Sequence, residues 1–206
     1  MKKNHFIISK GLKRILNPPA IHNCTLDMTA KVCSKSELTK VSIGKYSYVG
    51  NDYFMVNVDI GAFCSIADRV CIGGANHPIE RVSSSPVFHE GKNVLGKNFQ
   101  RFPYEHTPKT IIGNDVWLGI GVIVKAGVHI HTGAVVGMGS VVTRDIPAYE
   151  IWAGNPAKKI RDRFDQATAE KLLETKWWDS SDNDIEEFSK YFESAALFLD
   201  EIHDEN

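Results

Sequence analysis

The sequence IGNDVWLGIGVIVKAGVHIHTGAVVGMGSVVTRDIP (112–147) divides into six consecutive blocks of six residues. Each block begins with Ile, Leu or Val, and its fifth residue is small or β-branched. Five further blocks lie earlier in the chain, and an interruption of the register separates them from these six. They are IGKYSY (43–48), VGNDYF (49–54), IGAFCS (60–65), IADRVC (66–71) and IGGANH (72–77). The first residue is aliphatic in all eleven blocks, and the second is glycine in seven. A period of six over this length is an internal repeat, and it dominates the interpretation of the chain.

This period excludes two common architectures. An apolar period of six does not match the 3.6 residues of a helical turn, and Gly and β-branched residues disfavour helices. An antiparallel sandwich would show alternation and Asn-Gly hairpin turns, which these blocks lack. We therefore predict a parallel β-helix, in which each block is a short strand and a bend. The first and fifth residues point inward, the glycine permits the bend, and each coil buries its apolar side against its neighbours.

The composition excludes several function classes. The chain has 206 residues, 43% of them hydrophobic and 24% charged, with a net charge of -1. These values indicate a globular protein and argue against nucleic acid or an anionic membrane as partner. No apolar run is long enough for a transmembrane segment or a signal peptide, so we expect a cytoplasmic protein with four free cysteines. The basic stretch before residue 20 is compatible with a short amphipathic helix that touches a membrane or with a tail.

Four motifs resemble the hexapeptide-repeat acyltransferases, in particular the xenobiotic acetyltransferase branch and its O-acetyltransferase relatives: GGANHP (73–78), TIIGNDVWLG (110–119), WAGNPAKKIRDRF (152–164) and KWWD (176–179). The resemblance covers roughly residues 41–180. It implies left-handed coils, which are an exception to the right-handed crossover rule. It also implies acetyl-CoA as the acetyl donor and a homotrimer with active sites between subunits.

The chain divides into three parts. Residues 1–40 are expected to form an N-terminal cap, in which an irregular first coil is possible. Residues 41–160 form the β-helix, interrupted by a long excursion at 78–109 that is rich in Ser, Pro and aromatic residues. A long excursion in a compact domain is usually functional. Residues 161–206 are expected to be helical and to cover the end of the solenoid or a neighbouring subunit.

Capping residues mark two helices in this last part. Asp165 is placed to cap a helix that begins at Gln166. Ser181 and Asp184 form a capping box before a second helix over 185–199, with its apolar residues on one face.

His77 is the candidate catalytic base, because it stands where the regular register ends and the excursion begins. Transfer of an acetyl group to an alcohol requires a base near neutral pH, for which imidazole is suited. The resemblance assigns this role to the histidine of the GGANHP motif, although a turn histidine bonded to the backbone is the alternative. The partner that orients His77 is left open between a backbone carbonyl and the carboxylates of Asp52, Asp59 and Glu80. The other loop and terminal histidines, His89 and His106 among them, are expected to be solvated.

The cofactor residues follow from the resemblance and from position. Trp117 ends its block and should lie near a corner, where it lines a cofactor groove or packs between subunits. Lys158 and Lys159 follow the last coil and suit the phosphates of acetyl-CoA. The remaining predicted cofactor residues are Gly119, Gly137, Asn155 and Pro156.

Metal and covalent catalysis are not expected. His129 and His131 have a spacing compatible with zinc on one strand, but no third or fourth ligand accompanies them. Cys64 and Cys71 lie inside blocks without a basic neighbour that would lower a thiol pKa. Direct transfer with the base, without an acyl-enzyme, is therefore expected.

The acceptor is predicted to bind the excursion, with Phe88 and Tyr104 stacking on it and with Asn76 and Asp52 contributing polar contacts. GGANHP is closer to the sugar-modifying relatives than to the drug-modifying ones, so a hydroxyl of a cell-surface carbohydrate is favoured. The alternatives are an antibiotic-inactivating chloramphenicol or streptogramin acetyltransferase, a sugar N-acetyltransferase and a non-catalytic β-helix scaffold. A β-helical carbonic anhydrase lacks the required histidine spacing.

Overall fold

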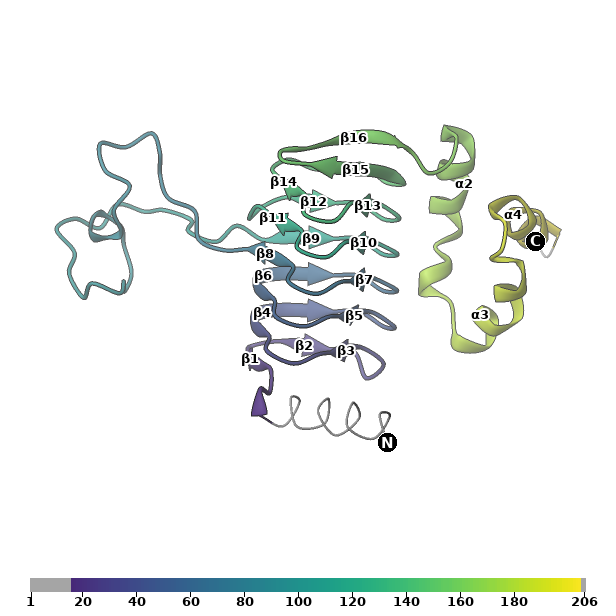
Figure 1. Ribbon diagram of the computed structural model, residues 1–206, viewed down its shortest axis with the longest axis horizontal. Coiled ribbons are helices and arrows are strands. Elements are labelled where there is room, and N and C mark those ends of the chain that lie inside the picture. The colour runs from purple at the N-terminus through teal and green to yellow at the C-terminus, as the bar shows by residue number, and fades with distance from the viewer. Residues whose placement is uncertain (1–15, 205–206) are drawn as a thin grey trace, which may run out of the picture.

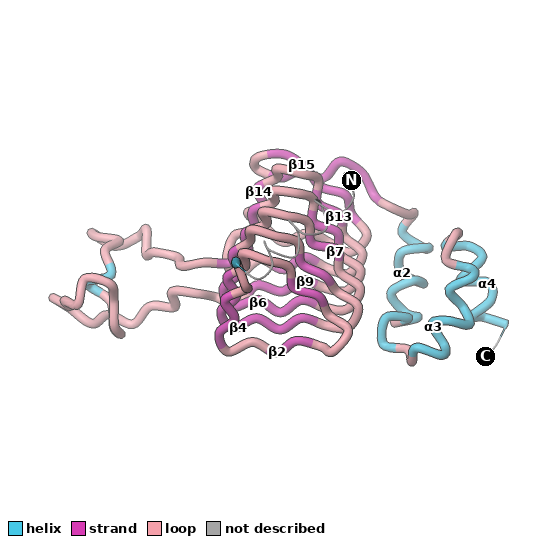
Figure 2. Tube along the Cα trace, turned by 60° about the horizontal axis from the view of Figure 1, so that its bottom comes forward, coloured by secondary structure: helices cyan, strands magenta, loops and turns pink. Residues whose placement is uncertain are grey.

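The structure, a computed structural model, describes residues 16–204 and contains a three-sided solenoid with a helical segment on one side and a long loop on the other (Figures 1 and 2). The coils form the predicted left-handed parallel β-helix. The first face contains β1 (Ala20–His22), the first half of β4 (Glu37–Ile43), the first half of β6 (Phe54–Ile60), β8 (Cys71–Gly73), β11 (Ile123–Val124) and β14 (Val141–Val142).

The two other faces are built in the same way. The second face contains β2 (Thr25–Leu26), the second halves of β4 and β6, β9 (Thr110–Ile112) and β12 (His129–Ile130). The third contains β3 (Lys31–Val32), β5 (Tyr48–Val49), β7 (Ser65–Ile66), β10 (Trp117–Leu118), β13 (Val135–Val136) and β15 (Glu150–Gly154). An antiparallel partner of β15, β16 (Ala157–Asp162), ends the solenoid.

The length of a coil explains the repeat and its one irregularity. Trp117 pairs with Val135, so a late coil takes 18 residues, or three blocks. Glu37 pairs with Phe54, so an early coil takes only 17. The missing residue is at the corner between the first and second faces, which Lys40 and Asn57 turn alone with φ of 55°. This short corner produces the offset of eleven between two early blocks of the sequence.

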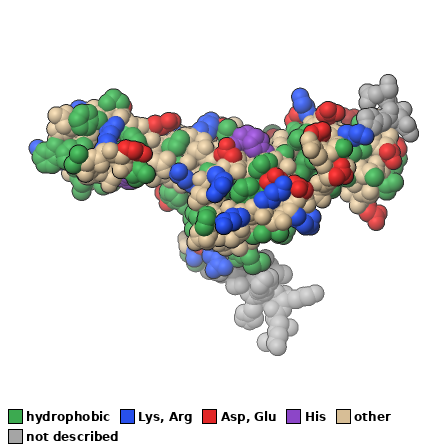
Figure 3. All heavy atoms as spheres, turned by 90° about the horizontal axis from the view of Figure 1, so that it is seen from above, with side chains coloured by type: hydrophobic (Ala, Val, Ile, Leu, Met, Phe, Trp, Pro, Cys, Tyr) green, Lys and Arg blue, Asp and Glu red, His purple; other side chains and the backbone are tan. Residues whose placement is uncertain are grey.

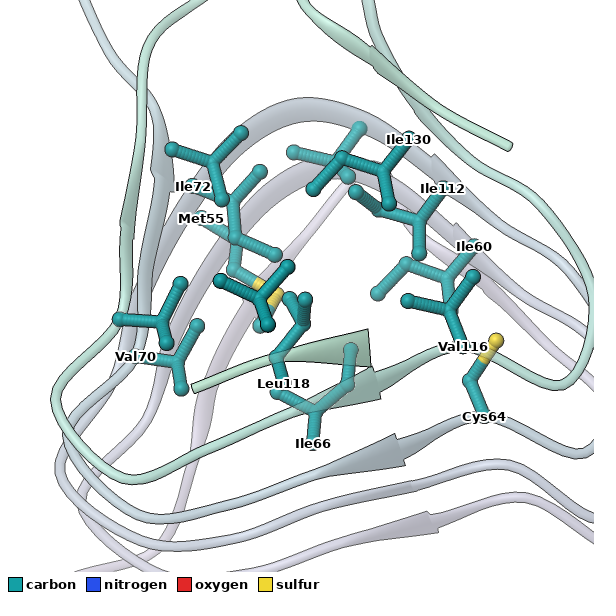
Figure 4. Packing of buried hydrophobic residues seen from close by; sticks show 14 of the residues in the cluster. Met55, Ile60, Cys64, Ile66, Val70, Ile72, Ile112, Val116, Leu118 and Ile130 are labelled. Atoms are coloured by element: carbon teal, nitrogen blue, oxygen red, sulfur yellow. The ribbon is translucent and has the colours of Figure 1, made fainter. Parts of the chain in front are cut away.

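The core is a stack of the repeat's first and fifth residues (Figure 4). Ile66, Leu118 and Ile130 are fully buried first residues, and Cys64, Val70 and Val116 are buried fifth residues. Each contacts its equivalents in the coils above and below, as predicted, so the apolar interior is continuous along the solenoid.

The reason for glycine at the second position differs from our prediction. The left-handed bend lies at the fourth residue of the block, such as Asp115 with φ of 51° or Gly121 with φ of 71°. The second residue is small because the next coil passes over it: a Cβ on Gly119 would lie 2.7 Å from the backbone nitrogen of Met138. Close stacking of coils, rather than the bend, therefore selects this glycine.

The N-terminal boundary also differs from the expected cap. Strands β1, β2 and β3 all come from residues 20–32, within the segment assigned to a cap, and they pair in parallel with β4 and β5. The first coil therefore begins at Ala20. The amphipathic helix considered before residue 20 lies largely outside the described residues.

The C-terminal helices lie beside the solenoid, not across its end (Figure 1). Asp165 caps α2 (Gln166–Thr175), and Ser181 with Asp184 caps α3 (Asp182–Phe188), both as predicted. The second predicted helix is interrupted, because short 3-10 turns at Trp177–Asp179 and Ser189–Tyr191 divide the segment and α4 (Ala195–Asp204) starts anew.

Aromatic packing attaches this helical segment to the solenoid. The Trp177 ring lies 4.9 Å from that of Phe63 on a coil corner and 5.0 Å from that of Phe192. In addition, the Lys45 ammonium donates to the Ser180 carbonyl at 2.5 Å. Within residues 16–204, no helix is both long and apolar enough to span a bilayer.

Candidate active site

The excursion leaves the solenoid after β8 and returns at β9. It replaces a corner that is turned by the single residue Asn57 in the preceding coil. Gly73 and Gly74 begin it with φ of 80° and 108°. Two hydrogen bonds close its base: the Asn76 N–H donates to the His106 carbonyl at 2.6 Å, and the Asn57 amide donates to the Thr107 carbonyl at 2.7 Å. His77 is thereby held at the corner between the first and second faces.

The orientation of His77 follows from one contact. Its Nδ1 lies 2.8 Å from the Ser84 carbonyl oxygen. A carbonyl can only accept, so Nδ1 carries the proton and the Nε2 lone pair is available as a base. The ring is exposed to solvent. The imidazole is therefore both fixed in tautomer and accessible.

Two of the three carboxylates considered as partners of His77 have other partners. Asp59 accepts from Lys109 at 2.6 Å and from Ser42 at 2.7 Å. Asp52 pairs with Lys35 at 3.7 Å, on the corner between the third and first faces. Asp52 therefore does not orient His77 within one chain.

The excursion contains a small aromatic core next to His77. Its centre is His89, whose ring centroid lies 4.8 Å from that of His106, 5.2 Å from that of Tyr104 and 6.3 Å from that of His77. Phe88 lies outside this cluster and packs against Phe99 at 6.0 Å. Tyr104 is thus close to the base, whereas Phe88 supports the loop.

His89 corrects one expectation. We expected a solvated loop histidine, but the side chain is 0% exposed. Burial, together with the nearby His106, Arg81 and His77, lowers the pKa of His89. The sequence contained little signal for this cluster, because its members are spread over 81–106 in a segment without periodicity.

The predicted cofactor glycines and the β15–β16 hairpin come together at the corner between the third and first faces. Gly119 stacks under Met138, and Gly137 stacks under Ala153. The hairpin continues this column, since Ala153 pairs with Lys158 around the turn that contains Asn155 and Pro156. The sequence-predicted residues on this corner therefore form one continuous edge.

Two predicted cofactor residues, Trp117 and Lys159, are placed differently from the prediction. Trp117 is 54% exposed and lines a groove of about 820 Å³ along the third face, together with Tyr48, Val135 and Arg161. Lys159 is paired with Glu150 at 2.7 Å and Asp162 at 2.8 Å, which raise its pKa. Lys159 is therefore less available to a phosphate than the exposed Lys158.

Within one chain the two halves of the predicted site are separate. His77 follows β8 at one edge of the first face, and the glycine corner precedes β11 and β14 at the other edge. A second cavity of about 230 Å³, beneath the C-terminal helices and lined by Tyr149, Trp177 and Phe198, lies across the solenoid from the excursion.

Covalent catalysis through Cys64 is disfavoured, since burial raises the pKa of its thiol to about 12. His129 and His131 stack with ring centroids 3.7 Å apart. Among residues 16–204 no group of three or more His, Cys, Asp or Glu side chains is arranged to hold a metal ion.

The left-handed β-helix is the fold that the resemblance to the hexapeptide-repeat acyltransferases implies. The family described as bacterial transferase hexapeptide (six repeats) matches residues 109–144. A chloramphenicol acetyltransferase of Klebsiella aerogenes is 35% identical over 162 residues, which cover 68% of this chain and 76% of that protein. The galactoside O-acetyltransferase of Escherichia coli K12 is 34% identical over 131 residues, covering 62% and 57%.

The solved structure of AntD, an N-acyltransferase from Bacillus cereus, shares the fold with a TM-score of 0.51 at 20% identity, covering 84% of this chain and 97% of that one. The chain belongs to the hexapeptide-repeat acyltransferases, and it is an acetyltransferase.

Proposed function

We propose that this acetyltransferase moves an acetyl group from acetyl-CoA to a hydroxyl of a carbohydrate, with His77 as the general base. One observation carries the proposal: the Ser84 carbonyl binds Nδ1 of His77 at 2.8 Å and leaves Nε2 free at the mouth of the excursion. A base whose tautomer is fixed by the backbone requires no reorganisation before it accepts a proton.

The acetyl donor supplies an activated thioester, and the chain's own residues perform the proton transfers. His77 takes the proton of the acceptor hydroxyl at Nε2 as the oxygen attacks. The Ser84 carbonyl stabilises the resulting imidazolium, because it accepts the Nδ1 hydrogen. His77 then returns the proton to the departing sulfur, so the base is regenerated in each cycle.

The glycine corner is compatible with the pantetheine arm of acetyl-CoA. A Cβ on Gly121 or Gly139 would meet no atom within 4 Å, so open space borders the backbone there. The N–H groups of both glycines already donate within the solenoid, to the Asp68 and Ile120 carbonyls, so the pantetheine arm would lie along this open backbone without using these two donors. Lys158, exposed at the end of the same edge, supplies a positive charge for the phosphates.

We infer that the active site is completed in a homotrimer. In a single chain the glycine corner and His77 lie on opposite edges of the first face, so a donor bound at the corner needs the His77 of a neighbouring copy. The excursion also exposes many large apolar side chains, which form a visible part of its surface in Figure 3. They are Ile79, Val82, Val94, Leu95, Phe99 and Phe102.

The acceptor class distinguishes the two candidate functions. The galactoside O-acetyltransferase relative and the aromatic rings beside His77 support a carbohydrate, since sugar faces stack on such rings. The chloramphenicol acetyltransferase relative, which matches more of both chains, supports an antibiotic acceptor as the second candidate.

The test is acceptor-dependent thiol release from acetyl-CoA, measured with methyl glycosides, nucleotide sugars, chloramphenicol and a streptogramin. We expect release with a carbohydrate and its absence without acceptor. Release with chloramphenicol at a higher kcat/KM than with every carbohydrate would replace the first candidate by the second.

A further inference from the structure

Two side chains inside the excursion bury hydrogen-bonding groups that have no partner among residues 16–204. They are both ring nitrogens of His89 and the Nη1 nitrogen of Arg81. Buried polar groups without partners are uncommon, because each one loses its bonds to water without replacement. Two such groups in one loop indicate that something outside the described chain binds there.

The two groups face the same ring. The Arg81 guanidinium lies over Tyr104 and over Phe102, 5.6 Å from each ring centroid. His89 lies 5.2 Å from the same Tyr104 ring. The other terminal nitrogen of Arg81, Nη2, donates to the Pro103 carbonyl at 2.8 Å, which fixes the guanidinium and leaves Nη1 unpaired. Arg81 and His89 therefore both pack against Tyr104 and form one cluster with it.

The permanent charge in this cluster is that of the Arg81 guanidinium. The charged groups that influence His89 are His106, Arg81 and His77, without a carboxylate among them. No ion pair of Arg81 with Asp or Glu occurs in the described part of the chain. Because a guanidinium stays charged at all relevant pH values, Arg81 presents a permanent, unpaired cation donor.

We propose that Arg81 and His89 form an anion-recognising subsite for the acceptor, so that the preferred acceptor is a sugar bearing a carboxylate. This inference rests on the proposed function, because it takes the excursion as the acceptor site of His77. The planar guanidinium suits a carboxylate, and His89 adds a second donor. With the rings of His89 and His77 only 6.3 Å apart, one sugar unit can place its carboxylate at the subsite and a hydroxyl at the base.

The first test compares the binding of matched acceptor pairs by calorimetry at constant ionic strength. The probes are methyl galactoside with methyl galacturonide, and methyl glucoside with methyl glucuronide. Each pair differs only at C6, which carries a hydroxymethyl group in the glycoside and a carboxylate in the uronide. We expect at least one uronide to bind about tenfold more tightly than its neutral partner. Equal affinities in both pairs would overturn the proposal.

Variants then locate the preference. Arg81→Met and His89→Phe should each reduce uronide affinity to that of the neutral glycoside, whereas Lys92→Met, which removes an exposed charge from the same excursion, should preserve the difference. His89→Phe keeps a ring in the core and removes an unpartnered polar group, so its melting temperature should be at least that of the wild type. A uronide preference that survives in Arg81→Met would contradict the subsite.

Two further measurements show which molecule supplies the anion and distinguish failure of the subsite from failure of the proposed function. A phosphate of the donor could occupy the same subsite, in which case Arg81→Met would weaken CoA binding and leave uronide binding unchanged, against our assignment. Acetyl transfer that favours neutral sugars would overturn the subsite while the proposed function stands. Uronide-selective binding without any acceptor-dependent thiol release would overturn the proposed function while the subsite stands.

Discussion

Gly119 shows how a single residue determines the spacing of the coils. Its hydrogen atom faces the backbone of Met138 in the next coil, so the two coils approach more closely than any side chain permits. Gly121, two positions later, turns the corner with φ of 71° and has open space beside it. The two glycines of one block therefore serve different physical needs.

This difference predicts contrasting substitutions. Gly119→Ala should lower the free energy of unfolding by about 1–3 kcal/mol, because the added methyl group forces the coils apart. Gly121→Asn should cost less than about 1 kcal/mol, since Asn tolerates the left-handed region and Asp115 occupies the equivalent position one block earlier. Urea denaturation of both variants checks this, and equal losses would contradict the assignment of roles.

The stacked pair His129 and His131 predicts a pH dependence of stability. Partial burial and the adjacent His131 lower the pKa of His129 from its ordinary 6.5, while Asp145 partly opposes them. The unfolded chain therefore binds more protons below about pH 6.5, and stability should fall as pH falls through the interval between the two values. His89, whose pKa is lowered too, acts in the same direction.

The measurement is the free energy of unfolding at about pH 7.5 and about pH 5.5, in His129→Gln and in the wild type. We expect a smaller difference between the two pH values in the variant. His22→Gln, on the exposed strand β1, is the control for loss of a histidine. A variant with the full wild-type difference would show that His129 does not contribute.

At the residue scale, the sequence predicted the inward-facing positions of the repeat but not the buried cluster around His89. The same position is aliphatic in all eleven blocks, so Ile66 and Leu118 could be assigned to the core from the pattern alone. His89 and Arg81 lie in a segment without a repeat, where burial depends on how the loop folds on itself. The carbonyl partner of His77 could not be chosen either, since any backbone group in the loop was a candidate.

At the element scale, the excursion and the C-terminal helices are additions to a self-sufficient solenoid. The excursion takes the place of a corner that Asn57 turns alone one coil earlier, and its base is closed by bonds to Asn57 and between its own ends. The solenoid core does not depend on it, because β8 and β9 also pair with β6. Its boundaries could be read from the interruption of the repeat, but its internal fold could not.

Replacement of residues 75–108 by Asn-Gly should therefore leave a folded β-helix without acetyl transfer activity. Circular dichroism should retain the β spectrum, and thiol release should fall to the level without enzyme, because His77 and Arg81 are both removed. An unfolded product would contradict the independence of the solenoid, and residual transfer would contradict the assignment of the site to the excursion.

The helical segment depends on its caps. In Ser181→Ala the capping box of α3 is lost, and we expect a decrease of about 1 kcal/mol in the free energy of unfolding. Lys45 and Trp177 hold the preceding turn against the solenoid, so the loss should remain local. Hydrogen exchange of α3 measures it; faster exchange throughout the solenoid would contradict a local effect.

At the scale of the whole molecule, the two proposed half-sites lie on different corners of the chain. The glycine corner with Lys158 and the base His77 are separated by the first face, which explains why residues grouped as one site in the sequence do not meet in one chain. The hexamer pattern predicts the coil and its core, but the pairing of corners between copies depends on surface shape that the pattern does not encode. We expect sedimentation equilibrium to give three times the chain mass; a monomer with full activity would contradict the shared site.

We would first measure acetyl transfer by His77→Ala and by the control variant His22→Ala, with the acetyl-CoA affinity of both. We predict that His77→Ala loses a factor of about 100 to 10,000 in kcat, as expected for a general base, while its affinity for acetyl-CoA stays within about two-fold of the wild type. His22→Ala should retain most of its turnover, since His22 lies on the exposed strand β1, away from the excursion. Wild-type turnover by His77→Ala would contradict the central claim.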